Sequence, residues 1–156
     1  MGAMSLRETL QEDLSAAMRR QDALATTTLR QLITAIQYEE VAGDSARVLS
    51  DGEAVGVLAR EAKKRSESAA IYHDAGREDL ATQEEAEGEI IATYLPEELS
   101  DPDLDELVDQ AVTAAGAVDM KGVGQVMRLL TPMVAGRADG RRMSERVRAR
   151  LGTVGR

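Results

Sequence analysis

The sequence predicts an all-α protein, on the strength of three observations. Apolar residues recur at helical spacing along nearly the whole chain, and no alternating stretch of useful strand length interrupts them. Aromatic residues supply only 2% of the 156 positions, so the core must be aliphatic, which favours packed helices over aromatic-rich sheets. Pro96 divides this pattern. We therefore expect a four-helix N-terminal domain over 4–95 and a smaller three-helix C-terminal domain over 96–152.

Four helices are expected before Pro96. The first three have apolar stripes formed by Leu6, Leu10, Leu14 and Met18, by Leu29, Leu32, Ile33 and Ile36, and by Val55, Leu58, Ala62, Ala69 and Tyr72. A left-handed cap near Gly43 should end the second helix, and Ser50 and Glu53 have the spacing of a capping box that begins the third. The fourth falls within 78–95, because proline disfavours a helical conformation in the residue before it.

Three shorter helices are expected after Pro96. Ser100 is a suitable N-cap for the first of them, and Gly116 is a suitable end. The second is interrupted by Pro132, and the last is capped by Ser144. Their apolar faces are formed by Leu104, Leu107, Val108, Ala111 and Ala115, by Val123, Val126, Met127, Leu130 and Met133, and by Val147 and Leu151.

Missing residue types narrow the chemistry. Without Cys there is no disulfide, thiolate nucleophile or zinc–cysteine site, which fits a reducing compartment, so we expect a cytoplasmic protein. A single His excludes a His-cluster metal site. No apolar run approaches the roughly 20 residues that span a bilayer. Residues 1–3 resemble a tag remnant before a start at Met4 and lack the features of a signal peptide. We expect no metal, no cofactor and no membrane partner.

Three groups of ionisable residues have simpler explanations than a catalytic or metal site. A calcium loop could begin at Asp101, Asp103 and Asp105, but its turn glycine and its final bidentate carboxylate are missing, so first-turn capping is the better interpretation. The glutamates within 84–89 are expected on a solvated helix face. His73 is expected at the surface or near a helix end, because no nucleophile elbow accompanies it.

The net charge of −9 argues at first against a nucleic-acid partner, but the charge is unevenly distributed. Residues 1–120 carry 10 Lys+Arg against 26 Asp+Glu, a net −16, whereas residues 121–156 carry 9 against 2, a net +7. In the basic end the candidate phosphate contacts are Lys121, Arg128, Arg137, Arg141 and Arg142. The loop that contains Gly136, Asp139 and Gly140 matches no nucleotide-binding motif and is expected to expose its arginines or to cap a helix.

A second basic cluster lies in the third expected helix. Arg60 and Lys64 share one face at i, i+4 spacing, so the two cations could contact one phosphate backbone. Pairing with Glu61, Glu67 or acidic residues of neighbouring helices is an equally good interpretation. Tyr38, Tyr72 and Tyr94 are all expected to be partly buried, which argues against base stacking on single strands.

An ordered series of motifs resembles the YqeY family. It consists of residues 58–68, Tyr72, residues 75–81, the run Ile90–Pro96, Val126–Met127 and Gly136–Gly140. The resemblance covers about Met4 to Leu151. The family is similar to the C-terminal helical and tail region of the GatB subunit of the tRNA-dependent Asp/Glu amidotransferases. This resemblance implies the same two helical domains and contact with tRNA. The catalytic centres of that carbon–nitrogen ligase, which uses glutamine as amide donor, lie elsewhere.

The sequence therefore favours a non-catalytic accessory protein that binds tRNA or another structured RNA and is associated with transamidation by resemblance. No catalytic residue is identified, and we do not expect DNA as a partner. The alternative is a protein-interaction adaptor, whose acidic helical domain docks a basic, translation-related protein.

Overall fold

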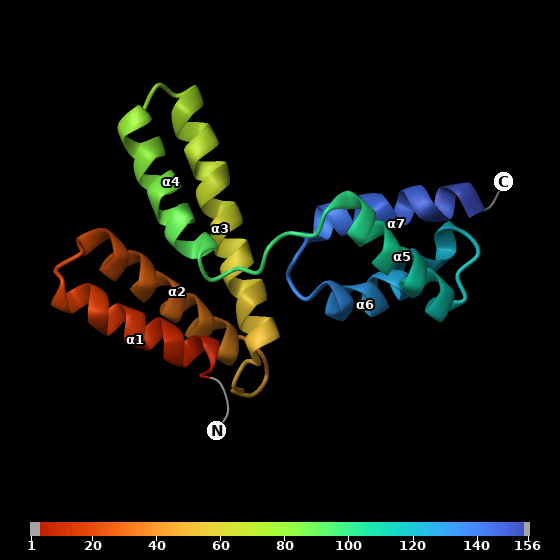
Figure 1. Ribbon diagram of the computed structural model, residues 1–156, viewed down its shortest axis with the longest axis horizontal. Helices are drawn as coiled ribbons and strands as arrows, with labels where there is room; N and C mark the ends of the chain where they lie inside the picture. Colours follow the sequence, from red (N-terminus) through yellow and green to blue (C-terminus); the bar gives the residue numbers. More distant parts are fainter. Residues whose placement is uncertain (1–3, 155–156) are drawn as a thin grey trace. The chain divides into compact units, whose positions relative to one another are not determined.

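Helices make up all the regular structure in the described part of the chain, residues 4–154 of a computed structural model (Figure 1). They are α1 (Leu6–Arg19), α2 (Ala23–Val41), α3 (Asp51–Asp74), α4 (Glu78–Ala92), α5 (Asp101–Ala115), the short 3₁₀ helix η1 (Met120–Gly122), α6 (Val123–Val134) and α7 (Gly140–Val154). The predicted all-α class is confirmed. None of these helices is long and apolar enough to cross a membrane. The expected tag remnant, residues 1–3, lies outside the described residues.

The chain forms two compact units, which we call the N-terminal unit (Met1–Leu95) and the C-terminal unit (Pro96–Arg156). Each unit encloses its own apolar core. That of the N-terminal unit is centred on Leu10, Leu32 and Leu58, and that of the C-terminal unit on Leu104 and Leu130. The aromatic-poor composition is therefore sufficient for both cores, because aliphatic side chains at helical spacing fill them.

The N-terminal unit consists of two helical hairpins, α1–α2 and α3–α4 (Figure 1). The predicted capping box at Ser50 and Glu53 is present at the start of α3. Gly76 lies in the turn between α3 and α4 with a φ of 74°, a left-handed conformation that costs glycine little. The tight turn allows α4 to run back along α3. The two hairpins meet at the end of the unit where α2 leads into α3.

Polar contacts also join the elements of this unit. Arg65 of α3 donates a hydrogen bond to Gln31 of α2 at 2.6 Å and forms an ion pair with Glu87 of α4 at 3.5 Å. The Tyr94 hydroxyl, just after α4, donates to the Asp13 carboxylate of α1 at 2.5 Å. Partial burial and the hydrogen bond to the carboxylate both raise the pKa of Tyr94.

In the C-terminal unit, α5 and α7 lie parallel to one another and α6 packs against both. Ser100 caps α5 as predicted, and Gly116 ends it in the left-handed conformation. The buried stripe of α7 continues from Met143 through Val147 to Leu151. These residues close the second core over the apolar faces of α5 and α6.

Two predictions for the first two helices are wrong. Met18 is 49% exposed, because residues four apart drift by about 40° around a helix and the fourth member of the stripe has left the buried face. Gly43 is not in a left-handed conformation, and α2 ends earlier, at Val41. The chain beyond α2 is held instead by Glu40, whose carboxylate accepts a hydrogen bond from the Leu49 N–H at 3.1 Å.

Two predictions for the last helices are also wrong. Pro132 does not interrupt α6: the helix continues to Val134 although the proline has no N–H to donate to the preceding turn. Ser144 lies inside α7 and does not cap it. The cap is Asp139, whose carboxylate accepts a hydrogen bond from the Arg142 N–H at 2.7 Å, so that the helix begins at Gly140.

Candidate functional site

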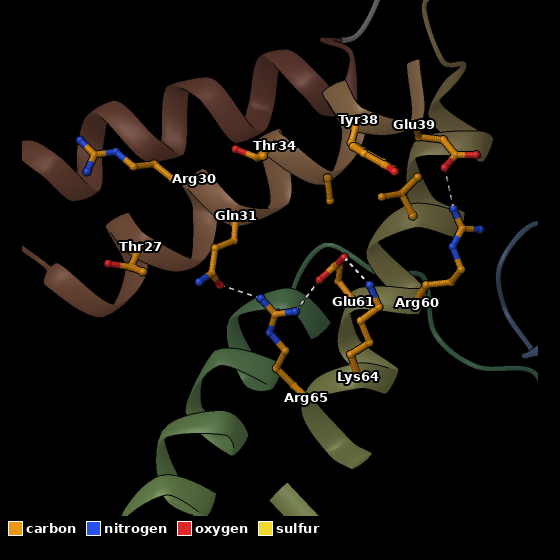
Figure 2. Close-up of a pocket in the computed structure, with 12 residues that line it drawn as sticks. Thr27, Arg30, Gln31, Thr34, Tyr38, Glu39, Arg60, Glu61, Lys64 and Arg65 are labelled. Atoms are coloured by element: carbon orange, nitrogen blue, oxygen red, sulfur yellow. Dashed lines mark hydrogen bonds and ion pairs between the residues drawn. The ribbon is translucent and has the colours of Figure 1, made fainter. Parts of the chain in front are cut away.

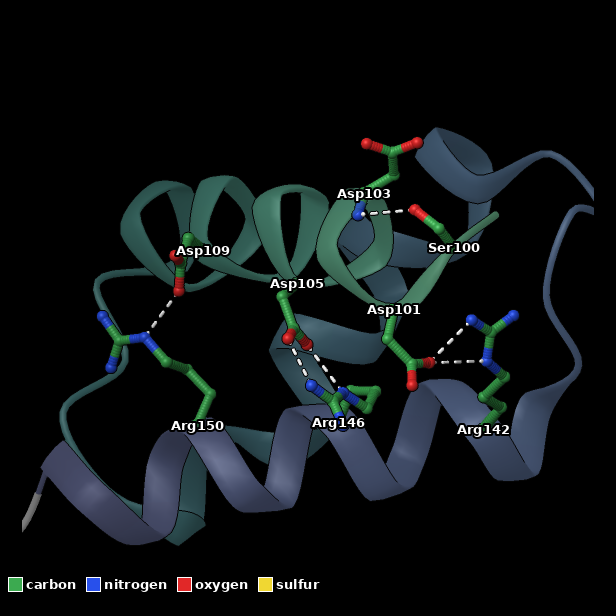
Figure 3. Close-up of polar contacts among 8 residues, drawn as sticks. All are labelled: Ser100, Asp101, Asp103, Asp105, Asp109, Arg142, Arg146 and Arg150. Carbon is green, nitrogen blue, oxygen red and sulfur yellow. Dashed lines mark hydrogen bonds and ion pairs between the residues drawn. The ribbon is translucent and has the colours of Figure 1, made fainter. Parts of the chain in front are cut away.

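Three arginines of the basic end form a ladder of ion pairs with three aspartates of α5 (Figure 3). The pairs are Arg142–Asp101 at 2.8 Å, Arg146–Asp105, which is bidentate, and Arg150–Asp109 at 2.6 Å. The two members of each pair are 41 residues apart, which is the register of two parallel helices. The Arg146 guanidinium holds the pKa of the Asp105 carboxyl below its usual value.

The ladder changes how the charge of the basic end is interpreted. The C-terminal unit, residues 96–156, contains 9 Lys+Arg and 10 Asp+Glu, a net charge of −1. The +7 of residues 121–156 is thus offset within the unit, in part by direct contact. Of the predicted phosphate-contacting residues, Arg142 is committed to Asp101. Two of the aspartates considered as the start of a calcium loop, Asp101 and Asp105, form ion pairs with arginines of α7.

Arg137 and the glycine-containing loop have structural roles. The Arg137 guanidinium donates to the main-chain oxygens of Val134 at 3.0 Å and Met133 at 3.2 Å, where α6 ends and its terminal carbonyls favour a cation. Gly136 has a φ of 81°, so a residue with a side chain would be strained there. With Asp139 as the cap of α7, the loop connects two helices and does not form a cradle for phosphate.

The remaining predicted cations of this unit are exposed. Lys121 lies in η1 and Arg128 in α6, and neither has a carboxylate partner among the described residues. Arg141 pairs with Glu145 at 3.2 Å on the outer face of α7. Arg148 lies on the same face, because seven residues make almost two full turns. The sequence interpretation missed Arg148, although its spacing from Arg141 reveals it.

In the N-terminal unit, α2 and α3 border an open groove of about 680 Å³ (Figure 2). It brings together the predicted residues Arg60 and Lys64 of α3. Its remaining lining residues are Thr27, Arg30, Gln31, Thr34, Ala35, Tyr38 and Glu39 of α2 and Val57, Glu61 and Arg65 of α3. The lining therefore contains four cationic and two anionic side chains, although the net charge of the whole unit is −8.

The ion pairs of the groove are of two kinds. Arg65 is only 12% exposed and bonds closely to Glu61. By contrast, Arg60 lies 3.6 Å from Glu39 and Lys64 lies 3.4 Å from Glu61, and both of these cations are well exposed. Arg60 and Lys64 thus have partners, as the alternative interpretation expected, but the pairs are long and surrounded by solvent. Such pairs contribute little and can exchange partners.

Tyr38 contradicts the expectation that all three tyrosines are partly buried. It is 73% exposed, because it stands about 200° around the helix from the buried Ile36. Tyr38, Thr34 and Arg30 follow one another at i, i+4 spacing along the groove side of α2 (Figure 2). A helical projection of residues 23–41 places this polar stripe opposite the apolar one, and that is the signal by which the sequence could have shown it.

His73 lies near the end of α3, between two glutamates. Its Nδ1 is 2.6 Å from a Glu78 carboxylate oxygen, and its Nε2 is 2.5 Å from an oxygen of Glu85. Hydrogen bonds to Glu78 and Glu85, in that order of effect, raise the pKa of His73 to about 9. The arrangement joins the end of α3 to α4. The expectation of a fully solvated 84–89 face is wrong for Glu87, which is buried against Arg65.

Comparison with known proteins places the chain in a family. The model of the family described as Yqey-like protein matches residues 7–151. Similar proteins include those named "Altered inheritance of mitochondria protein 41, mitochondrial" from three fungi. That of Vanderwaltozyma polyspora is 30% identical over 121 residues, which are 73% of this chain and 64% of the fungal protein.

The other two relatives are aligned over more of their length. That of Meyerozyma guilliermondii is 32% identical over 82% of this chain and 75% of its own. That of Pyrenophora tritici-repentis is 29% identical over 92% and 79%, respectively. The alignment thus spans just under two thirds of the first relative and three quarters or more of the other two. Because the family match runs through both helical units, the chain belongs to the YqeY family.

Proposed function

We propose that the protein is a non-catalytic accessory protein that binds structured RNA, with tRNA as the leading partner. The observation that carries this proposal is the α2–α3 groove, whose lining exposes Arg30, Arg60 and Lys64, whereas its fourth cation, Arg65, is bound to Glu61 and Glu87. A local excess of cations on an acidic unit attracts a polyanion to one place and disfavours contact elsewhere.

Arg60 and Lys64 are suited to phosphate contact. They stand one helical turn apart on the exposed side of α3, and each is held only by a long ion pair. A phosphate oxygen can replace either carboxylate, because an exposed pair of this kind contributes at most about 1 kcal/mol. The bound RNA would also release counterions, which is the main source of affinity in such complexes.

The C-terminal unit supplies a second set of contacts in this proposal. Arg141 and Arg148 share the outer face of α7, and Lys121 and Arg128 are exposed on η1 and α6. Phosphate contacts of this kind fix position and read shape more than sequence. The association with amidotransferases rests on the similarity of the YqeY family to the C-terminal region of GatB. We propose it on that ground alone.

The proposal is tested by titration with bulk tRNA at several salt concentrations. Saturable binding is expected, and its log–log salt slope should increase by about 0.9 for each phosphate contact. The double variant Arg60→Ala/Lys64→Ala should weaken binding and reduce the slope by nearly two. Its matched control is Lys63→Ala/Arg77→Ala, which removes the same charge from exposed positions outside the groove. An equal loss of tRNA affinity in both double variants, or no tRNA binding by the natural protein at low salt, would overturn the proposal.

A protein-interaction adaptor is the second candidate. The observation that favours it is the net charge of −8 on the N-terminal unit, together with the exposed apolar side chains Val41 and Val48 beside the α2–α3 connection. A basic partner, such as a translation-related protein, would suit this surface. Copurification from a nuclease-treated lysate discriminates between the two candidates, because partners that survive the nuclease favour the adaptor.

Two further points belong to the proposal. We propose that the N-terminal and C-terminal units are separate domains, which is tested by the unfolding of 4–95 and 96–152 expressed separately. We also propose a cytoplasmic protein, whereas the names of its fungal relatives point to mitochondria as the alternative. Cell fractionation with an antibody to the protein decides between these two compartments.

A further inference from the structure

We propose that the α2–α3 groove selects unpaired nucleotides, with the ring of Tyr38 as the surface on which a base stacks. This inference rests on the proposed function and specifies the part of the RNA that the groove takes. Three features of the groove support it: the exposure of Tyr38, the mixed apolar and polar lining, and the cations of α3.

Tyr38 has the properties of a stacking platform. The residue is 73% exposed, although a tyrosine usually packs at least one face of its ring against the rest of the protein. Its hydroxyl makes no hydrogen bond within the described residues, so no polar contact of the hydroxyl fixes the ring there. Tyr94 differs, because its hydroxyl is bound to Asp13. An exposed ring on a rigid helix offers a face to any base at low conformational cost.

The groove that Tyr38 borders offers both apolar and polar groups to a nucleotide. Ala35 and Val57 belong to the same lining and add apolar surface to the groove. Gln31 and Thr34 line the same groove and supply amide and hydroxyl groups that can bond to base edges or to a 2′-hydroxyl. The apolar part of the lining thus suits the base, and the polar part suits the edge of the base and the sugar.

Arg60 and Lys64 complete the arrangement from the opposite helix. They project from α3 toward the side of the groove that Tyr38 borders, and their long ion pairs leave them able to turn to phosphate (Figure 2). Cations along a groove together with an aromatic face are the two elements that single-strand-binding proteins combine. A base in a duplex is already stacked on both faces, so it cannot use Tyr38. Phosphate contacts alone would not make this distinction.

The experiment compares two labelled RNAs by fluorescence anisotropy: an unstructured oligouridylate of ten nucleotides and a ten-base-pair duplex. Tyr38→Ala should weaken single-strand binding by about fivefold or more and change duplex binding by less than twofold. Tyr38→Phe keeps the ring and should bind like the natural protein. Ile71→Ala is the matched control, since it removes an exposed apolar side chain of α3 outside the groove. Thermal unfolding verifies that all variants fold.

The outcomes separate this inference from the proposed function. Salt-dependent binding of tRNA with no effect of Tyr38→Ala on the single strand would overturn the inference and leave the proposed function standing. Equal weakening of the single strand and the duplex by Tyr38→Ala would also overturn it, because the ring would then not act by stacking. If the natural protein binds none of the three RNAs, the proposed function and this inference fall together.

Discussion

Arg146 donates two hydrogen bonds to the carboxylate of Asp105 and thereby connects the last helix of the chain to the first helix of the same unit (Figure 3). The neighbouring pairs Arg142–Asp101 and Arg150–Asp109 repeat the contact one turn before and one turn after it. The basic end and an acidic helix are therefore complementary surfaces of one fold. This complementarity sets the charge that the C-terminal unit presents to a partner.

The first prediction is that removing the α5 aspartates increases RNA affinity. Asp101→Asn/Asp105→Asn/Asp109→Asn changes the net charge of the unit from −1 to +2 and releases the α7 arginines. Phosphate can then contact these arginines, so tRNA binding should become tighter and its salt dependence steeper. The measurement is a tRNA titration at several salt concentrations.

The matched control for this prediction is Asp103→Asn/Glu106→Gln/Asp119→Asn. It removes the same charge from exposed residues of the unit that form no ion pair with α7. The ladder variant should bind more tightly than this control. If the two variants bind alike, only net charge matters and the ladder does not hide the arginines.

This ladder shows why the sequence alone misplaced the charge. The i, i+4 spacing of Asp101, Asp105 and Asp109 is visible in the sequence, as is that of the three arginines. Their pairing depends on a register of 41 residues between parallel helices, which is fixed by the packing of Val147 and Leu151 into the second core. Local periodicity predicts the helices but not which of their polar faces meet.

In the N-terminal unit, too, the helices could be predicted from local patterns, but the contacts between helices could not. Apolar stripes and the capping box predicted its helices, because these signals act within a few residues. The groove itself required two helices to meet, so Arg60 and Lys64 were identified without the residues of α2 that face them: Arg30 was missed, and Tyr38 was wrongly expected to be partly buried. Glu87 was misjudged for the same reason, since its burial comes from Arg65 on another helix.

The second prediction concerns the ion pair of Arg65 and Glu87, whose side chains are 12% and 9% exposed. Arg65→Ala leaves Glu87 as a buried charge without its partner and removes the contact with Gln31. The free energy of unfolding should fall by about 3 kcal/mol or more, measured by urea denaturation. Lys64→Ala is the control, because this side chain is 68% exposed, and its effect should stay within about 0.5 kcal/mol.

A double variant decides why Arg65→Ala destabilises. If the cause is the unpaired Glu87, then Arg65→Met/Glu87→Leu should recover most of the loss, since an apolar pair of similar volume avoids burying a charge. No recovery would show instead that the bonds of Arg65 to Gln31 and Glu61 carry the stability.

The third prediction concerns Thr28, whose hydroxyl is buried in α2 without a hydrogen-bond partner among the described residues. Thr28→Val replaces the hydroxyl by a methyl group of similar size, which removes the cost of burying an unbonded polar group. The unfolding free energy should rise by about 1 kcal/mol. Thr28→Ser keeps the hydroxyl and loses a methyl group, so it should destabilise. A destabilised Thr28→Val would show that the hydroxyl is bonded in solution.

The fourth prediction concerns the pH dependence that His73 confers. It is the single histidine of the chain, so its ring gives one resolved ¹H–¹³C signal whose titration reports its pKa. Glu78 and Glu85 bond to the two ring nitrogens, and the expected midpoint is about 9, against 6.5 for a free side chain. The folded state thus favours the charged ring. Its contribution to stability is complete below pH 6.5 and is lost as the pH rises through 9.

Replacing the two partners should abolish this behaviour. In Glu78→Gln/Glu85→Gln the midpoint should return toward 6.5, and the thermal midpoint should lose its His73-dependent decline between pH 6.5 and 9. Glu84→Gln/Glu89→Gln removes two carboxylates from the same helix that form no ion pair with His73, so His73 should titrate almost as in the natural protein. A natural protein that titrates near 6.5 would show that the end of α3 is not joined to α4 by His73 in solution.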